Sequence, residues 1–369
     1  MNPKRIAIIS ILKPVDDIRS YEKFTKTLAQ TGDYLIDLIG YPSQTVHEDA
    51  DHIRFHSLSA FNPKSKERFK QRKVIWNKLK EIKPDLIICT THELLATSIK
   101  AKFRLGCKII YDIQENYFYN LWYQNNYSTL VKTGLAIAVR LKETVLCGYF
   151  DHFFLAEKSY ARELLFTSKR STILENKALN HLLVEEKSLH SRPTFVFTGT
   201  LTESNGILRC LKFMKQIKAS APNYRFRIAG HCPDKSIWNE LESEQYSFIE
   251  KDISIDPIPY DKILEVIHSA DFGFIAYRLN PSNQYCMPTK VFEYVAAKVS
   301  CIYESGAMWS QSLEKHRLGI KIDYDHFEID DFLNTQTDYQ INEDFDRSHV
   351  VWDTESTEMI KSVRRILIS

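Results

Sequence analysis

The chain has 369 residues, of which 44% are hydrophobic and 26% are charged. At ~150 residues per domain, this length predicts two domains, each with its own core. The formal net charge of +2 is too small to indicate a nucleic-acid partner. No uninterrupted apolar run approaches the ~18 residues of a membrane-spanning helix.

The cysteines are scattered along the chain, and no two of them form a C-x-x-C motif. Cys89 and Cys301 lie within apolar runs, which is typical of buried thiols in a reducing compartment. The apolar-leaning segment after Lys4 and Arg5 is short for a signal peptide. These features predict a cytoplasmic protein without disulfide bonds or a zinc site.

The first half of the chain alternates short apolar runs with longer amphipathic ones. The apolar runs are rich in Ile, Leu, Val and Phe without polar alternation, as strands buried on both faces of a sheet are. Helical patterns at 20–30 and 157–166 lie between them. This alternation predicts a doubly wound parallel sheet. The strands are expected at 5–11, 34–39, 52–56, 85–89, 108–113, 152–156 and 172–174.

Two segments of this half have an unusual composition. Segment 64–83 is rich in Lys and Arg with aromatic residues between them, and segment 132–146 is a largely apolar helix carrying Arg140 and Lys142. Such segments suit contact with an anionic membrane surface. Two amphipathic helices that cover the sheet with solvated outer faces explain the pattern equally, and both interpretations stay open.

A polar segment, 180–192, interrupts the alternation and ends at Pro193. We therefore predict an N-terminal domain over 1–187, a second domain over 188–352, and a C-terminal helix over 353–369 that packs back on the N-terminal domain. The strands of the second domain are expected at 194–198, 225–229, 272–276, 300–303 and 319–322.

In open parallel sheets, ligands bind at the carboxyl ends of the strands. The loop 199–206 follows the strand 194–198 and contains Gly199, Thr200, Asn205 and Gly206 ahead of a helical pattern. Glycines let the backbone approach a ligand, and helix N–H groups attract anions, so a diphosphate could bind here. A plain strand–helix turn is the alternative. His231 ends the next strand, where a base could pack or a histidine could simply lie exposed in a turn.

A further helix is expected to open at Pro288, with Lys290 and Glu293 about one turn apart. A lysine that meets phosphate oxygens beside a glutamate that accepts hydrogen bonds from ribose hydroxyls would bind a nucleotide. An ordinary surface Lys–Glu pair is equally compatible with these residues.

In the first domain, Asp112 and Glu115 lie at the end of the strand 108–113. A carboxylate there could remove a proton from an acceptor hydroxyl, or it could cap the next helix. His92 follows the strand 85–89, and Asp17 and Arg19 follow the first strand. These three residues are candidates for lining an acceptor pocket, and a structural role is the alternative for each.

A resemblance to a known family rests on the runs Ile258-Pro259-Tyr260, Ser269-Ala270-Asp271-Phe272-Gly273 and Pro288-Thr289-Lys290-Val291-Phe292-Glu293-Tyr294. Their order and spacing resemble the donor half of GT-B glycosyltransferases of family four. Looser matches at 109–115 and 157–160 extend the resemblance through the N-terminal half. The loop 13–19 is closer to the subgroup that makes bacterial surface polysaccharides.

The resemblance implies two Rossmann-like domains facing a central cleft, with a nucleotide-sugar donor bound mainly by the second domain. It assigns Glu293 to the ribose, Lys290 to the phosphates and the loop after Gly199 to the diphosphate. Tyr277, after the strand 272–276, joins the expected donor site. Two positions depart from the family pattern: Tyr285 replaces a common glutamate, and Gln114 replaces a histidine and so cannot remove a proton.

We therefore expect a hexosyltransferase that moves a sugar from a nucleotide donor to a hydroxyl of a saccharide or polyprenyl-linked acceptor. Family analogy favours retention of anomeric configuration and a place at the inner face of the cell membrane. No D-x-D motif follows a strand where it would hold a divalent ion, so we expect transfer without a metal ion or another cofactor. A nucleotide-sugar epimerase of the same fold and a catalytically inactive scaffold are the alternatives.

Overall fold

The computed structural model describes residues 3–45, 47–62, 65–123, 128–167, 170–187, 192–339 and 341–368. The chain forms two compact units, one made of Met1–Asn176 with Trp352–Ser369 and the other of Lys177–Val351. The division after Asn176 lies before the boundary expected at 187. The polar run that suggested that boundary thus belongs to the second unit.

Within the described residues, the first unit contains a seven-stranded sheet in the order β3-β2-β1-β4-β5-β6-β7. Every pairing between neighbouring strands is parallel. The chain order reverses between β1 and β4, which is the kind of position where doubly wound sheets bind ligands. The strands are β1 (Lys4–Pro14), β2 (Tyr34–Tyr41), β3 (Ile53–Ser57), β4 (Leu86–Cys89), β5 (Lys108–Ile113), β6 (His152–Leu155) and β7 (Ser171–Ile173).

The described part of the second unit contains a six-stranded parallel sheet in the order β10-β9-β8-β11-β12-β13. The strands are β8 (Thr194–Thr198), β9 (Arg225–His231), β10 (Ile249–Ser254), β11 (Phe272–Ile275), β12 (Ser300–Tyr303) and β13 (Gly319–Lys321). The sequence did not predict β10. This strand lies at the edge of the sheet and carries charged residues, so it lacks the apolar run of the buried strands. The expected fold class, two doubly wound parallel sheets, is confirmed.

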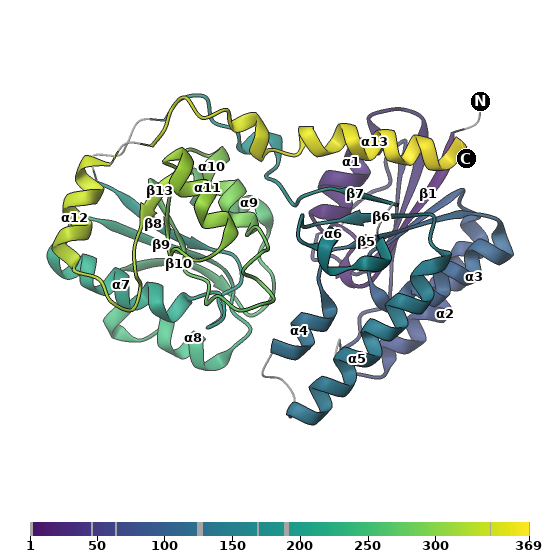
Figure 1. Ribbon diagram of the computed structural model, residues 1–369, viewed down its shortest axis with the longest axis horizontal. Coiled ribbons are helices and arrows are strands. Elements are labelled where there is room, and N and C mark those ends of the chain that lie inside the picture. The colour runs from purple at the N-terminus through teal and green to yellow at the C-terminus, as the bar shows by residue number, and fades with distance from the viewer. Residues whose placement is uncertain are drawn as a thin grey trace. The chain divides into compact units, whose positions relative to one another are not determined.

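Helices cover both faces of the first sheet (Figure 1). On one face α2 packs against α3, and α3 packs against α5. On the other face α13 contacts α1 and β7, and its Met359, Val363 and Ile366 join the core around Phe24. The helices of this unit are α1 (Lys26–Ala29), α2 (Glu67–Ile82), α3 (Leu95–Leu105), α4 (Tyr117–Tyr123), α5 (Thr129–Leu146), α6 (Tyr160–Glu163) and α13 (Asp353–Ile368), with the short segments η1 (Arg19–Thr25), η2 (His92–Leu94), η3 (Cys147–Tyr149) and η4 (Leu165–Thr167).

The helix expected at 157–166 is much shorter in the structure. Helix α6 ends after Glu163, because Leu164 leaves helical geometry with φ −112° and ψ 74° and buries its side chain. In the ranges that the structure describes, no helix is both long and apolar enough to cross a bilayer.

The helices of the second unit include α10, whose every residue from Lys290 to Ala296 is buried. This helix packs on β11 and β12. The helices are α7 (Ile207–Ser220), α8 (Lys235–Leu241), α9 (Tyr260–His268), α10 (Thr289–Ala296), α11 (Met308–His316) and α12 (Ile329–Asp338), with η5 (Asn180–Leu182), η6 (Glu244–Tyr246) and η7 (Arg347–Val350).

Helix α10 is held on the sheet by a close contact between Gly273 and Tyr294. A Cβ atom on Gly273 would lie 2.4 Å from Cε2 of the Tyr294 ring. The ring cannot move away easily, because it is fully buried and its hydroxyl lies 3.0 Å from Oγ1 of Thr198. Gly273→Ala should therefore lower the free energy of unfolding by about 1–3 kcal/mol in chemical denaturation.

The matched control is Gly134→Ala, at an open position of α5 where an added Cβ atom meets nothing within 4 Å. There the substitution should raise the free energy of unfolding by about 0.5–1 kcal/mol, because alanine favours the helix. A Gly273→Ala protein as stable as the wild type would mean that α10 does not depend on this contact.

Candidate functional site

The carboxyl ends of β8 and β11 and the start of α10 bring together most of the residues expected to bind the donor. Helix α10 follows Pro288, whose fixed φ of −61° suits a helix start. Its first turn places Lys290 under the loop that follows β8, where a Cβ atom on Gly199 would lie 3.0 Å from Cε of Lys290. The site is thus assembled from segments far apart in the sequence.

The ammonium group of Lys290 lies in an unusual environment. The residue is only 6% exposed, and Nζ has no hydrogen-bond partner among the residues that the structure describes. Nζ lies 3.9 Å from the centroid of the Phe197 ring and 5.6 Å from that of Tyr277. Burial lowers the pKa of Lys290 to about 8, against smaller opposing effects of Cys210 and Glu293. A buried cation without a hydrogen-bond acceptor is costly, so the site is suited to an anion.

The loop between β8 and α7 needs glycine at both ends. Gly199 has φ +97° and Gly206 has φ +84°, in the left-handed region that favours glycine. A Cβ atom on Gly206 would lie 1.9 Å from the carbonyl oxygen of Ala276. The absence of a side chain at Gly199 leaves the backbone next to the Lys290 ammonium open to a ligand.

Two further predicted residues hold this loop in place. Asn205 donates from Nδ2 to the carbonyl oxygen of Thr200 at 2.8 Å. The amide of Leu201 donates to the carbonyl oxygen of His231 at 2.8 Å, so the loop is tied to the end of β9. The structure therefore places Thr200, Asn205 and His231 at the same edge of the sheet as Lys290. In this structure the Asn205 side chain therefore binds the backbone of its own loop.

Glu293 lies one turn after Lys290 and is 7% exposed. Its Oε1 accepts a hydrogen bond of 2.8 Å from the hydroxyl of Tyr260, the first residue of α9. Because Lys290 and Glu293 are both buried, the interpretation as an ordinary surface pair is wrong.

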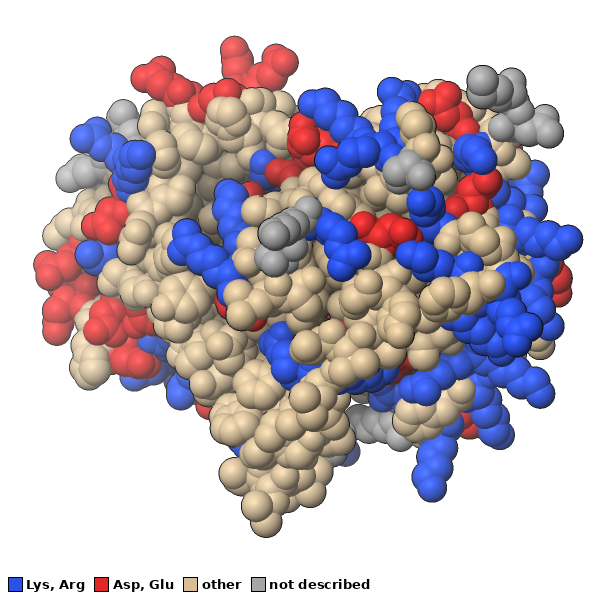
Figure 2. All heavy atoms as spheres, turned by 45° about the vertical axis from the view of Figure 1, so that its right-hand side comes forward, with Lys and Arg blue, Asp and Glu red and all other residues tan. Residues whose placement is uncertain are grey.

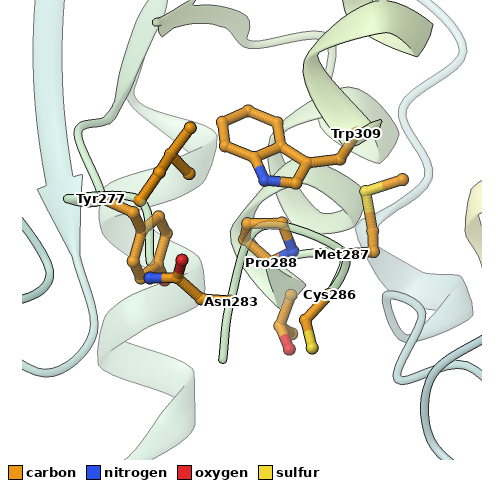
Figure 3. Close-up of a pocket in the computed structure, with 8 residues that line it drawn as sticks. Tyr277, Asn283, Cys286, Met287, Pro288 and Trp309 are labelled. Atoms are coloured by element: carbon orange, nitrogen blue, oxygen red, sulfur yellow. The ribbon is translucent and has the colours of Figure 1, made fainter. Parts of the chain in front are cut away.

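A pocket with about 250 Å³ of water-accessible volume opens at the start of α10 (Figure 3). Its walls are partly aromatic, with Tyr277 and Trp309 on different sides of Pro288. Burial raises the pKa of the Tyr277 hydroxyl, which is therefore neutral at pH 7. The remaining lining residues are Leu279, Asn283, Cys286, Met287 and Thr289.

Sequence reasoning missed Trp309 and Asn283 as pocket residues. Trp309 belongs to α11, which follows β12, and no motif marks it. Asn283 lies in the polar loop before Pro288, where its Oδ1 accepts from the amide of Asn280 at 2.8 Å. The position of each residue after a strand end, β11 for Asn283 and β12 for Trp309, was the one available signal.

In the first unit, two of the predicted residues form a buried ion pair. Arg19 donates from Nη2 to Oδ1 of Asp112 at 2.7 Å and from Nε to Oδ2 at 2.9 Å. Gln114 also donates to Oδ2 of Asp112 at 2.7 Å, and Arg19 reaches the carbonyl oxygen of Leu174 at 2.8 Å. Both charged side chains are buried. This ion pair gives both residues a structural role, and their roles as base and as acceptor ligand stay predictions.

The other candidates of the first unit are more accessible. Glu115 is exposed and accepts a hydrogen bond of 2.9 Å from Nδ2 of Asn120. Asp17 accepts from the amide of Ser20 at 3.1 Å, next to the start of η1. His92 lies at the end of β4, and burial together with nearby cations lowers its pKa to about 4. The imidazole of His92 is thus neutral at pH 7.

Replacement of Lys290 should stabilise the ligand-free protein. The pKa of this lysine is about 8 in the folded chain, against an ordinary value of 10.5, so the folded protein binds fewer protons than the unfolded chain between these values. Lys290→Met should raise the free energy of unfolding by about 2 kcal/mol at pH 7, because the buried charge is removed. This gain should shrink as the pH rises from about 8 toward 10.5, where wild-type stability recovers.

The measurement is chemical denaturation of both proteins across this pH range. Lys262→Met is the matched control, since the Lys262 side chain is 57% exposed on α9 and its removal should change little. A Lys290→Met protein less stable than the wild type at pH 7 would contradict the costly burial of this ammonium.

Comparison with known proteins extends the description of the fold. No protein-family model matches the chain, and no curated protein matches it significantly in sequence. Sucrose-phosphate synthase from Thermosynechococcus elongatus matches with a TM-score of 0.75 and 14% identity, over 99% of both chains. A glycosyltransferase from Rickettsia africae matches with a TM-score of 0.65 and 10% identity, over 100% of this chain and 96% of its own.

HepE from Anabaena, solved in complex with UDP and glucose, matches with a TM-score of 0.65 and 10% identity. The match covers 98% of this chain and 100% of HepE. At such identities the similarity concerns the fold. The chain has the GT-B fold of these glycosyltransferases, with two Rossmann-like domains.

Proposed function

We propose that this chain is a glycosyltransferase that moves a sugar from a nucleoside-diphosphate sugar to a hydroxyl group. The observation that carries the proposal is the buried ammonium of Lys290 beneath Gly199, without a hydrogen-bond acceptor in the described residues. The GT-B neighbours support the reaction class, and the UDP held by HepE favours a UDP-sugar as donor.

A diphosphate between Lys290 and the 199–206 loop would complete the hydrogen bonding of the ammonium. Helix α7 begins immediately after this loop, and the N–H groups at a helix start attract anions. During transfer, negative charge grows on the departing nucleoside diphosphate. Lys290 is positioned to stabilise this charge, and we propose that it does so in place of a divalent cation.

The neighbouring residues then take the other parts of the donor. Glu293 would accept hydrogen bonds from the ribose hydroxyls, with Tyr260 orienting its carboxylate. Tyr277 and the pocket beside Pro288 offer apolar walls for a ring, and His231 ends the strand next to β8. The observed burial of Glu293 supports this assignment, because a buried carboxylate retains the geometry that a specific contact requires.

For the acceptor, we favour Glu115 over Asp112 as the base, since Glu115 is an exposed carboxylate at the carboxyl end of β5. The finer expectations are kept as part of the proposal: membership of family four, retention of configuration and a role in bacterial surface polysaccharide synthesis. They rest on the family resemblance, and the buried helix that the motif from Pro288 to Tyr294 begins supports that resemblance.

Calorimetric titration with UDP tests the donor site. Lys290→Met should weaken UDP binding roughly tenfold to a hundredfold, because one charge-assisted hydrogen bond to phosphate contributes about 1.5–3 kcal/mol. Glu293→Gln should weaken UDP binding less than Lys290→Met does. It should also lower the rate of UDP-glucose turnover. The exposed Lys262→Met serves as control and should bind like the wild type.

Product analysis separates the reaction classes. A transferase releases UDP from UDP-glucose only slowly until a saccharide acceptor is added, whereas an epimerase converts the donor alone. Equal UDP affinity of the wild type and Lys290→Met would refute the donor site, and epimerised donor without acceptor would refute the transferase reaction.

A membrane contact through α2 and α5 is the second part of the proposal. Helix α4 has no buried residue, and α5 buries only Ala136 and Glu143 over its length. Leu130 at the start of α5 is 88% exposed, and Leu135 and Leu141 are exposed on the same helix. Figure 2 shows an almost uncharged projection at the lower edge, at the height of the α4–α5 tip in Figure 1. We call these two helices the α4–α5 hairpin.

The charges around the α4–α5 hairpin suit an anionic surface. The sequence from 116 to 142 contains Lys132, Arg140 and Lys142 but no Asp or Glu. Helix α2 exposes Lys70, Lys73 and Lys80, and Lys66 is exposed just before it, while Lys64 of the predicted segment lies outside the described residues. Apolar side chains that enter the lipid interface next to lysines would bind anionic membranes. Such contact would bring the enzyme to a lipid-linked acceptor.

Co-sedimentation with vesicles tests this contact. Leu130→Gln should reduce binding to phosphatidylglycerol vesicles about tenfold, because burial of one leucine contributes roughly 1.5–3 kcal/mol. Leu165→Gln is the control, since Leu165 is equally large and exposed but lies in η4. The membrane contact would be contradicted by wild-type protein that does not bind these vesicles. Dimers that cover the hairpin, detected by sedimentation equilibrium, would contradict it as well.

A further inference from the structure

A group of basic residues gathers at the carboxyl end of β4, at the base of the α4–α5 hairpin. Arg68 and Arg72 come from successive turns of α2, Lys142 comes from α5, and His92 comes from η2. We call these four residues the basic cluster. None of them belongs to the donor site of the second unit.

Direct contacts hold the cluster together. Arg68 forms an ion pair with Glu93, which follows His92 in the chain. Lys142 donates from Nζ to the carbonyl oxygen of His92 at 2.6 Å. The His92 ring packs edge-on against Tyr117 at a centroid distance of 4.5 Å. Helices α2, α4 and α5 thus converge on the same short segment after β4.

The hydrogen bonding of the cluster is incomplete. Nε of Arg68, Nε of Arg72 and Nδ1 of His92 are all buried, and within the described ranges none of them has a hydrogen-bond partner. Buried donors without acceptors cost free energy, and most native structures avoid them. Two guanidinium N–H groups without acceptors, beside an imidazole nitrogen without a partner, indicate a group that completes the site.

The charge of the cluster is also unbalanced. Arg68, Arg72 and Lys142 carry three positive charges against the one carboxylate of Glu93, which leaves two in excess because His92 is neutral. Glu143 is a further carboxylate near Lys142 and opposes part of this excess. Glu143 accepts from the hydroxyl of Tyr111 at 2.9 Å, and burial raises its pKa. Arg140 donates a hydrogen bond from Nη2 to Oδ1 of Asn116 at 2.6 Å.

The titration behaviour agrees with this crowding of positive charge. Burial and then Arg68 lower the pKa of Arg72, and burial and then Arg72 lower the pKa of Lys142. A bound dianion would relieve this repulsion. The guanidinium groups of arginine match the geometry of phosphate oxygens, and a phosphate monoester or diphosphate carries about two negative charges.

We propose that Arg68, Arg72, Lys142 and His92 form a binding site for a phosphate or diphosphate group. The binding itself is independent of the proposed glycosyl transfer, whereas the role of the site rests on it. The cluster lies at a strand end, where acceptors bind in such sheets, and below an apolar hairpin. An acceptor whose phosphate sits here would present its saccharide to the edge of the sheet.

The test is calorimetric titration with inorganic diphosphate, carried out on the full chain in a Lys290→Met background so that the donor site contributes little. Arg72→Gln should weaken binding about tenfold or more, since one charge-assisted hydrogen bond is lost. The control Lys70→Gln also removes one positive charge from α2. Lys70 lies between Arg68 and Arg72 in the sequence, but its side chain is exposed on another side of the helix. This control should bind diphosphate like its parent.

Vesicles distinguish the source of the phosphate. If the site takes a lipid phosphate, Arg72→Gln should weaken binding to phosphatidic acid vesicles more than Lys70→Gln does. If it takes a soluble phosphate, the two variants should bind vesicles equally while Arg72→Gln alone loses diphosphate. Equal behaviour of both variants with diphosphate and with vesicles would overturn the site.

Thermal unfolding without phosphate provides an independent measurement. Arg72→Gln should unfold at the wild-type temperature or above it, because the substitution relieves repulsion and retains the side-chain stem. A clearly lower unfolding temperature would show that Arg72 is an ordinary structural residue and would overturn the proposal. Loss of UDP binding at Lys290 has no bearing on these results, so the two proposals fail separately.

Discussion

The burial of the Lys290 ammonium is the constraint on which the proposed donor site depends. An ammonium removed from water normally pairs with a carboxylate or coordinates several acceptors. Here it is supported by the face of Phe197, below a glycine that leaves the backbone open. Such a site is stable enough to fold but incomplete without an anion. The contact between Gly273 and Tyr294 holds α10, and therefore Lys290, against the sheet.

Buried charges in this chain differ in whether their hydrogen bonding is complete. In the first unit Arg19 and Asp112 satisfy each other with parallel hydrogen bonds, and this pair joins η1 to β5. In the second unit the Lys290 ammonium lacks an acceptor in the part of the chain that the structure describes. Charge alone therefore does not identify a ligand site. The distinction lies in whether the neighbouring side chains complete the hydrogen bonding, because completed pairs stabilise the fold and incomplete ones favour a ligand.

The first unit combines an apolar projection with a group of basic residues at its base. Helix α5 spans roughly 27 Å at 1.5 Å per residue, more than the short strands it accompanies, so its first turns extend past the sheet. The exposed leucines therefore follow from the length of the helix. The same arrangement sets Arg72 and Lys142 at the edge of the sheet. Two features that are separate in the sequence thus meet at one end of the fold.

The sequence by itself determined the two parallel sheets and the helix that carries Lys290 and Glu293. Strands buried on both faces are uniformly apolar, so they can be recognised from the sequence without knowledge of their neighbours in the fold. The charged edge strand β10 lacks that pattern and was not predicted. Only the tertiary structure decided that Lys290 is buried, that Arg19 and Asp112 pair across 93 positions, and that Trp309 reaches the pocket. These properties depend on segments far apart in the chain, and burial is set by what such segments place around a side chain.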